Sequence, residues 1–136
     1  MARKQARDAT MQLIYEWSMG GCGEETFEEL LDAKRFTEED REYVFAILNG
    51  VKENIENIDK LISDNAIDWK IERMPKIDLS ILRFAVYELT IDKSVPDTIV
   101  INEAVRLAKK YSSDKSISFI NGLLASVLKK EELSDA

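Results

Sequence analysis

One run of apolar residues constrains the fold more than any other feature of this chain. Between Val44 and Ile62, apolar side chains recur at intervals of three and four, and charged residues occupy the positions between them. Because an α-helix turns once every 3.6 residues, this spacing gathers the apolar side chains on one stripe that must be buried. The run predicts one long amphipathic helix of nearly six turns, with Thr37 and Asp40 forming a cap at its start.

The same spacing recurs along the rest of the chain, which has only five glycines and two prolines in 136 residues. The first predicted helix ends at the sequence GGCG, and the later helices are separated at Pro75 and at the sequence SVPD. Asp78 is expected to cap the helix that follows Pro75. The sequence DTIVI, which taken alone resembles a strand, belongs to a helical pattern. Besides the first helix and the long one, the predicted helices carry the apolar sets Phe27, Leu30, Leu31 and Ala33; Ile81, Leu82, Ala85 and Leu89; Ile101, Ala104, Ala108 and Tyr111; and Ile120, Leu123, Leu124, Val127 and Leu128.

These patterns predict an all-α protein of six to seven helices, folded as a single domain over residues 1–136. The last six or so residues are expected to fray. A single cysteine, Cys22, and a charged start without a signal peptide predict a cytoplasmic protein. No stretch reaches about 18 consecutive apolar residues, so no membrane span is expected.

The chain contains no histidine. This excludes the Ser-His-Asp and Cys-His nucleophile systems, and it removes the usual zinc ligand sets. The acidic residues are spaced as on a solvated helix face, and no glycine-rich cofactor loop is present. The sequence therefore predicts a protein that is not an enzyme and that carries neither a metal nor a cofactor.

Charge is distributed unevenly along the chain, whose formal net charge is -7. Residues 24–72 contain 15 acids and 6 bases, whereas Arg3, Lys4 and Arg7 open the chain with Asp8 as the only nearby acid. These cations lie at a helix start, where the helix dipole disfavours positive charge. Two interpretations are open: a solvated helix end, or a strip that contacts nucleic-acid phosphates.

A second candidate site lies in the sequence SISFINGLL, which contains Ser116, Phe119 and Asn121. Phe119 fits a position in the core. An aromatic residue beside polar side chains at a helix start also suits stacking on an unpaired base, with Asn121 reading a base edge or a phosphate.

Two long segments together identify a family. The sequences WKIERMPKIDLSILRFAVYELT and VPDTIVINEAVRLAKKYSSDKSISFINGLLASVL resemble the C-terminal half of NusB proteins, and RKQARDATMQLIYEW resembles their arginine-rich first helix. The resemblance implies two packed helical sub-bundles, of about residues 1–75 and 76–130. It also implies a transcription antitermination factor that binds boxA, a single-stranded RNA element of ribosomal RNA leader transcripts, together with the ribosomal protein NusE. That complex acts on the elongating RNA polymerase with other Nus factors.

The resemblance carries functional roles onto matching positions of this chain. Gln5 stands where the family often has arginine, and Lys115 stands where it commonly has an acid; Arg83 and Glu88 suit a structural role as readily as a partner contact. The predicted RNA-binding residues are Arg3, Lys4, Arg7, Lys115, Ser116, Phe119 and Asn121, and the predicted partner-binding residues are Tyr15, Asp78 and Glu88.

Two other functions remain open from the sequence. The first is a helical adaptor that binds only proteins, in which the basic start is merely a solvated helix end. A homodimer that covers its own RNA face is the second possibility.

Overall fold

The computed structural model describes residues 2–21, 28–29, 36–67 and 69–135. In this part of the chain the secondary structure is helical and contains no strand, which confirms the predicted all-α class. The short helix expected around Phe27, Leu30, Leu31 and Ala33 lies outside the described residues. The elements are α1 (Ala2–Ser18), α3 (Glu38–Glu53), α4 (Ile55–Asn65), the 3-10 helix η1 (Ile71–Arg73), α5 (Lys76–Thr90), α6 (Asp97–Tyr111) and α7 (Asp114–Asp135).

The predicted long helix is two helices joined at Asn54. Its start is as expected: the Asp40 backbone N–H donates to Thr37 Oγ1 at 3.1 Å, and the Thr37 N–H donates to Asp40 Oδ2 at 3.3 Å. At Asn54 the side-chain amide donates to the carbonyl of Gly50 at 2.8 Å, in the manner by which asparagine competes with regular helix bonding. The apolar stripe therefore continues across a break that its spacing does not reveal.

The capping role expected for Asp78 is wrong. Helix α5 begins at Lys76, directly after Pro75, and Asp78 is its third residue. Proline at the helix boundary supplies a fixed φ and leaves no N–H to satisfy, so the helix starts earlier than a carboxylate cap would place it. The Asp78 carboxylate is used in the interior instead.

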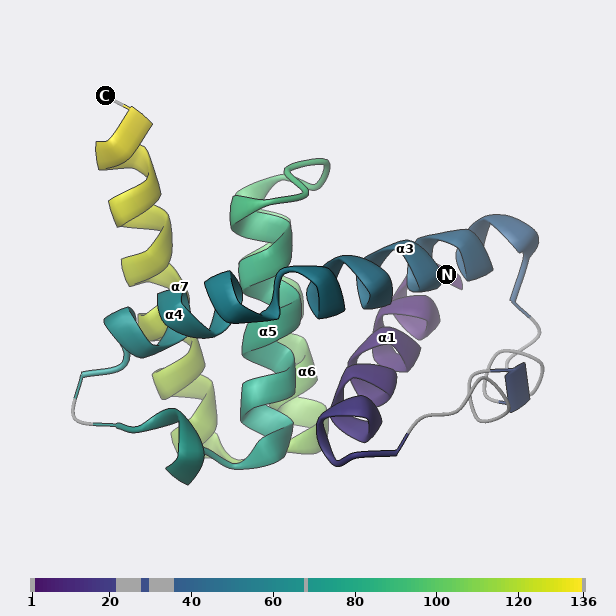
Figure 1. The fold of residues 1–136 in the computed structure, drawn as a ribbon, viewed down its shortest axis with the longest axis horizontal. Helices are drawn as coiled ribbons and strands as arrows, with labels where there is room; N and C mark the ends of the chain where they lie inside the picture. The colour runs from purple at the N-terminus through teal and green to yellow at the C-terminus, as the bar shows by residue number, and fades with distance from the viewer. Residues whose placement is uncertain (1, 22–27, 30–35, 68, 136) are drawn as a thin grey trace.

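Helix α5 is the centre of the molecule. It packs against α1, α3, α4, α6 and α7, and Figure 1 shows α3 and α4 crossing it while α1 and α7 lie on its two sides. Ten of its fifteen residues are buried, which is the property of a helix enclosed on most of its circumference.

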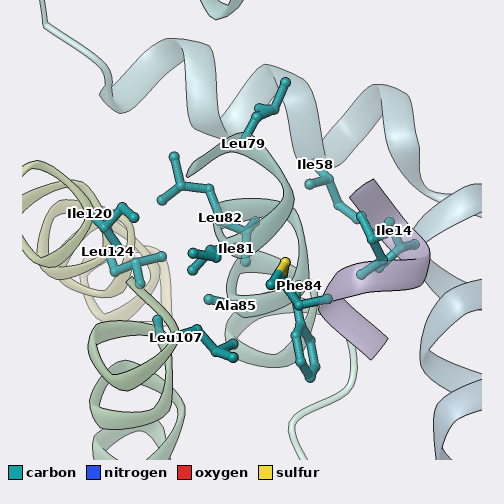
Figure 2. Close-up of a cluster of buried hydrophobic side chains, with 14 of the residues drawn as sticks. Ile14, Ile58, Leu79, Ile81, Leu82, Phe84, Ala85, Leu107, Ile120 and Leu124 are labelled. Atoms are coloured by element: carbon teal, nitrogen blue, oxygen red, sulfur yellow. The ribbon is translucent and has the colours of Figure 1, made fainter. Parts of the chain in front are cut away.

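The hydrophobic core is built around α5 from side chains of every long helix. Figure 2 shows Ile14 of α1, Ile58 of α4 and Leu124 of α7 meeting the α5 residues Leu82 and Phe84. These five side chains are at most 2% exposed. Three polar residues of α5, namely Asp78, Ser80 and Glu88, are also buried, and burial of such groups is favourable only where each finds a hydrogen-bond partner. The partners of Asp78 and Glu88 organise the two ends of α5.

Candidate nucleic-acid interface

The predicted N-terminal basic residues do not form one exposed strip in the structure. Lys4 is exposed, whereas Arg7 is 4% exposed, and the side chain of Arg3 lies outside the described part. Arg7 Nη1 donates to Glu88 Oε2 at 3.2 Å and to the Tyr43 hydroxyl at 2.7 Å, and Arg7 Nη2 is paired with the other Glu88 oxygen. The surface position expected for Arg7 is therefore wrong, because its charge is enclosed and bound to a carboxylate.

Glu88 is the centre of this buried network. It is 1% exposed and accepts a further hydrogen bond from the Tyr43 hydroxyl at 3.2 Å. Burial raises the pKa of Glu88, and the attraction of Arg7 offsets only part of that rise. The guanidinium of Arg7 also lies 4.8 Å from the centre of the Phe84 ring. The predicted contact of Glu88 with a partner protein is corrected: its carboxylate joins α1, α3 and α5.

Asp78 has the same kind of position at the other end of α5. It is 2% exposed, and its two carboxylate oxygens accept from the hydroxyls of Ser112 and Ser116. Ser116 is itself buried, at 7% exposure. The predicted contact of Asp78 with a partner is therefore replaced by an internal link, which ties the start of α5 to the start of α7. The predicted contact of Ser116 with RNA stays a prediction.

An aromatic pocket opens beside this link. Its walls are Trp69, which is 54% exposed, and Phe119, with ring centroids 5.8 Å apart and planes tilted by 55°. Two exposed cations, Arg73 and Lys115, line the same hollow of about 280 Å³. Asp78, Ser113 and Ser116 also line it. The pocket combines aromatic faces, positive charge and hydrogen-bonding groups, which together suit an unpaired nucleotide.

The structure brings only some of the predicted residues to this pocket. Lys115, Ser116 and Phe119 line it, but Asn121 does not. Asn121 is exposed two positions beyond Phe119, and residues two apart on a helix point to different sides. Tyr15 is half-buried near the end of α1, and its role toward a partner stays a prediction.

Sequence reasoning missed Trp69 and Arg73. Both lie in the connection between α4 and α5, where Trp69 is followed by Lys70, Arg73 and Lys76. An exposed tryptophan followed by three bases within seven positions is a signal for a nucleic-acid contact. Its pairing with Phe119, 50 positions later, is visible only in the fold.

Lys4 lies at the opposite end of α5, in a separate groove. This groove has a volume of about 610 Å³, and its lining includes Tyr43, Val95, Ile99 and the acidic Glu39. Since α5 has fifteen residues and an α-helix rises 1.5 Å per residue, the two sites are separated by roughly 20 Å. The predicted RNA-binding residues thus form two separate sites.

Within the described ranges, no group of three or more histidine, cysteine or carboxylate side chains is placed to hold a metal ion. None of the helices searched there is both long enough and apolar enough to cross a membrane.

Comparison with known proteins identifies relatives over nearly the full chain. Residues 4–129 match the model of the NusB family. The chain is 44% identical over 133 residues to the transcription antitermination protein NusB of Finegoldia magna, and the match covers 97% of each protein.

Solved structures agree with these matches. NusB of T. maritima superimposes with a TM-score of 0.84 and 32% identity, covering 97% of this chain and 96% of that one. A chain from the complex of the antitermination factors NusB and NusE with double-stranded RNA has the same TM-score and 31% identity, covering 94% and 96% respectively. Sequence and fold agree over the same residues, and the chain belongs to the NusB family.

Proposed function

We propose that this protein is a transcription antitermination factor that binds single-stranded RNA together with NusE. Its relatives carry the name transcription antitermination protein, and a structural relative forms a complex with NusE and RNA. The finer proposal is that the RNA is boxA of ribosomal RNA leader transcripts, and that the complex acts on the elongating polymerase with other Nus factors.

The observation that carries the RNA-binding proposal is the aromatic pocket. Trp69 and Phe119 offer ring faces for base stacking, and the cations Arg73 and Lys115 line the same hollow, where they can attract a phosphate. Stacking on aromatic side chains requires bases that are free of a duplex. The pocket therefore favours a single strand, even though the related NusB–NusE complex was solved with double-stranded RNA.

The first experiment measures binding of labelled boxA RNA by fluorescence anisotropy, with and without NusE. Phe119→Leu removes one stacking face, and each stacked base contributes about 1 to 3 kcal/mol, so we expect the variant to bind about 5- to 150-fold more weakly. Phe45→Leu, which changes an exposed phenylalanine on α3, is the matched control and should bind like the wild type. Unlabelled single-stranded boxA should compete better than a scrambled strand or a duplex.

The groove around Lys4 favours a second function. Its apolar residues Val95 and Ile99 lie beside Glu39 and Glu42, a combination that suits a basic protein segment. Absence of RNA binding in every condition, combined with retained binding of a basic partner, would establish the protein as an adaptor. Light scattering with and without RNA would reveal a homodimer that covers the RNA face.

A further inference from the structure

Side chains of α1 and α6 meet between the two sites, although both helices pack mainly against other helices, α5 among them. Asp8 of α1 is paired with both Arg106 and Lys110 of α6, the first at 2.8 Å. Four residues later, Gln12 Nε2 donates to the Tyr111 hydroxyl at 2.9 Å. We call the surface formed by Lys4, Asp8, Arg106, Lys109 and Lys110 the α1–α6 seam. It begins at the groove that contains Lys4 and ends where the chain turns toward Lys115 and the aromatic pocket.

Positive charge is concentrated along this seam. Residues 1–15 and 103–113 together contain six bases and two acids, Asp8 and Glu103, in a chain whose formal net charge is -7. Arg7 is neutralised by Glu88, and Arg106 is shared by Asp8 and Glu103. Lys4, Lys109 and Lys110 are exposed.

Lys109 and Lys110 are the exposed cations in the middle of this path. Lys109 is exposed and, among the described residues, has no ion-pair partner. The Lys110 side chain is 53% exposed although its ammonium donates to Asp8. An ammonium group has three donors, so this pairing leaves two for a ligand.

Asp8 directs Lys110 along the seam rather than away from it. Burial acts to raise the pKa of Asp8, but hydrogen bonds from Lys110 and Arg106 outweigh that effect and hold the pKa below its usual value. The carboxylate is therefore charged at neutral pH and keeps both cations at the contact of the two helices. Cations in the last turn of a helix also stabilise the helix dipole, which alone would explain why bases occur at these positions. The dipole does not account for a lysine that is turned sideways onto a neighbouring helix.

We propose that the RNA backbone follows the α1–α6 seam between the two sites, with Lys109 and Lys110 contacting its phosphates. This inference rests on the proposed RNA-binding function and adds a route between the aromatic pocket and the N-terminal cations. Helix α6 has fifteen residues and is roughly 22 Å long, which a strand spans with about six stacked nucleotides, or fewer when extended.

The test compares two double variants that each remove two adjacent exposed lysines. Lys109→Gln with Lys110→Gln alters the seam, and Lys129→Gln with Lys130→Gln alters the far part of α7. Affinity for labelled boxA RNA in the presence of NusE is measured from 50 to 200 mM salt. Each phosphate contact on a single strand contributes about 0.7 to the salt slope, so the wild type should lose about sevenfold more affinity over this range than the seam variant. The α7 variant should keep the wild-type slope.

Lys109→Gln alone is a second variant, because it breaks no ion pair within the described part of the chain and leaves Asp8 paired. We expect it to reduce the loss of affinity over the same salt range by about 2.6-fold. If the wild type binds RNA and both seam variants keep its slope, the route along the seam is overturned while the proposed function stands. Equal effects of the seam and α7 variants would also overturn it, since the lysines would then act only through net charge. If the wild type itself does not bind RNA, both the route and the proposed function fall.

Discussion

Arg7 and Glu88, 81 positions apart in the chain, form a buried ion pair in which both terminal nitrogens of the guanidinium donate to one carboxylate. Side-chain exposure is 5% for Arg7 and 1% for Glu88. Buried charges of this kind contribute little net stability as a pair, but either one left alone in the interior is very costly. The pair therefore fixes how α1 docks on α5 more than it adds to stability.

We expect Arg7→Ala to lower the free energy of unfolding by about 3 to 5 kcal/mol, because Glu88 would keep a buried charge without its partner. Urea denaturation measures this loss. Replacing both residues with apolar side chains of similar size, as in Arg7→Met with Glu88→Leu, should recover most of it. Lys4→Ala, at an exposed position on the same helix, should leave stability within about 0.5 kcal/mol of the wild type. Equal stability of Arg7→Ala and Lys4→Ala would contradict the structural role of Arg7.

Gly50 is required for the close approach of α3 to α5. A Cβ atom at this position would lie 2.2 Å from the Tyr87 hydroxyl and 2.3 Å from the ring carbon that bears it. Gly50→Ala should therefore lower the free energy of unfolding by about 1 to 2 kcal/mol, as an overpacked interior does. In a Tyr87→Ala background the same change should become neutral or stabilising, since alanine favours a helix by about 1 kcal/mol over glycine.

Gly122 supplies the matched control for Gly50. It also lies within a helix, but a Cβ there would have no atom within 4 Å. Gly122→Ala should raise the free energy of unfolding by about 0.5 to 1 kcal/mol. If the two glycine substitutions have effects of the same sign, the contact of Gly50 with Tyr87 is not what determines the result.

Asp8 should make stability depend on acid pH. Its pKa in the folded protein is held below the ordinary value of 3.8 by Lys110 and Arg106, against the opposing effect of burial. A depressed carboxyl pKa stabilises the fold above the unfolded-state value, and that contribution is lost as pH falls through the folded-state value. Asp8→Asn should therefore be less stable than the wild type at pH 7, and the difference should shrink below about pH 3.8.

Unfolding curves at pH 7, 4, 3 and 2 test this dependence. Asp64→Asn is the control, because the Lys60–Asp64 pair is largely exposed and should contribute little at any pH. A difference between Asp8→Asn and the wild type that stays constant across the series would show that the charge of Asp8 is not responsible.

Trp69 should report directly on RNA binding. The chain has two tryptophans, and Trp17→Phe leaves Trp69 as the single fluorescent indole. A base that stacks in the aromatic pocket should quench this emission, and the change should saturate at the same RNA concentration as anisotropy. Phe45→Leu in the same background should leave the quenching unaltered, whereas Phe119→Leu should weaken it. Tight binding with unchanged Trp69 emission would place the RNA elsewhere.

Much of the fold follows from local sequence signals. The Thr37–Asp40 cap, the apolar stripe beyond it and the helical character of DTIVI depend on residues within a few positions of one another. The break at Asn54 is also local, but the side-chain bond from Asn54 to Gly50 that accompanies it leaves the apolar spacing unchanged. Spacing therefore predicts which face is buried and does not predict whether the helix is continuous.

The candidate site was less predictable because its residues are paired over long distances. In the sequence Arg7 resembles an ordinary surface cation, and only the fold places Glu88 beside it. Likewise, only the fold brings Trp69 to the start of α7, where it contacts Phe119. Asp78 is predicted to contact a partner and Ser116 to bind RNA, yet their side chains bond to each other. Such pairings depend on how helices pack, which no local pattern in the chain records.

The central position of α5 also determines when the helices can dock on one another during synthesis. Helix α1 is translated first, but its packing partner α5 begins only at Lys76, and the counter-charge for Arg7 follows at Glu88. At typical elongation rates of 5 to 20 residues per second, Arg7 waits roughly 4 to 16 seconds for that carboxylate. Helix α3 is translated earlier and can cover part of the apolar stripe of α1, but the guanidinium of Arg7 lacks its carboxylate partner throughout this interval. The docking of α1 is therefore complete only after the second half of the chain has left the ribosome.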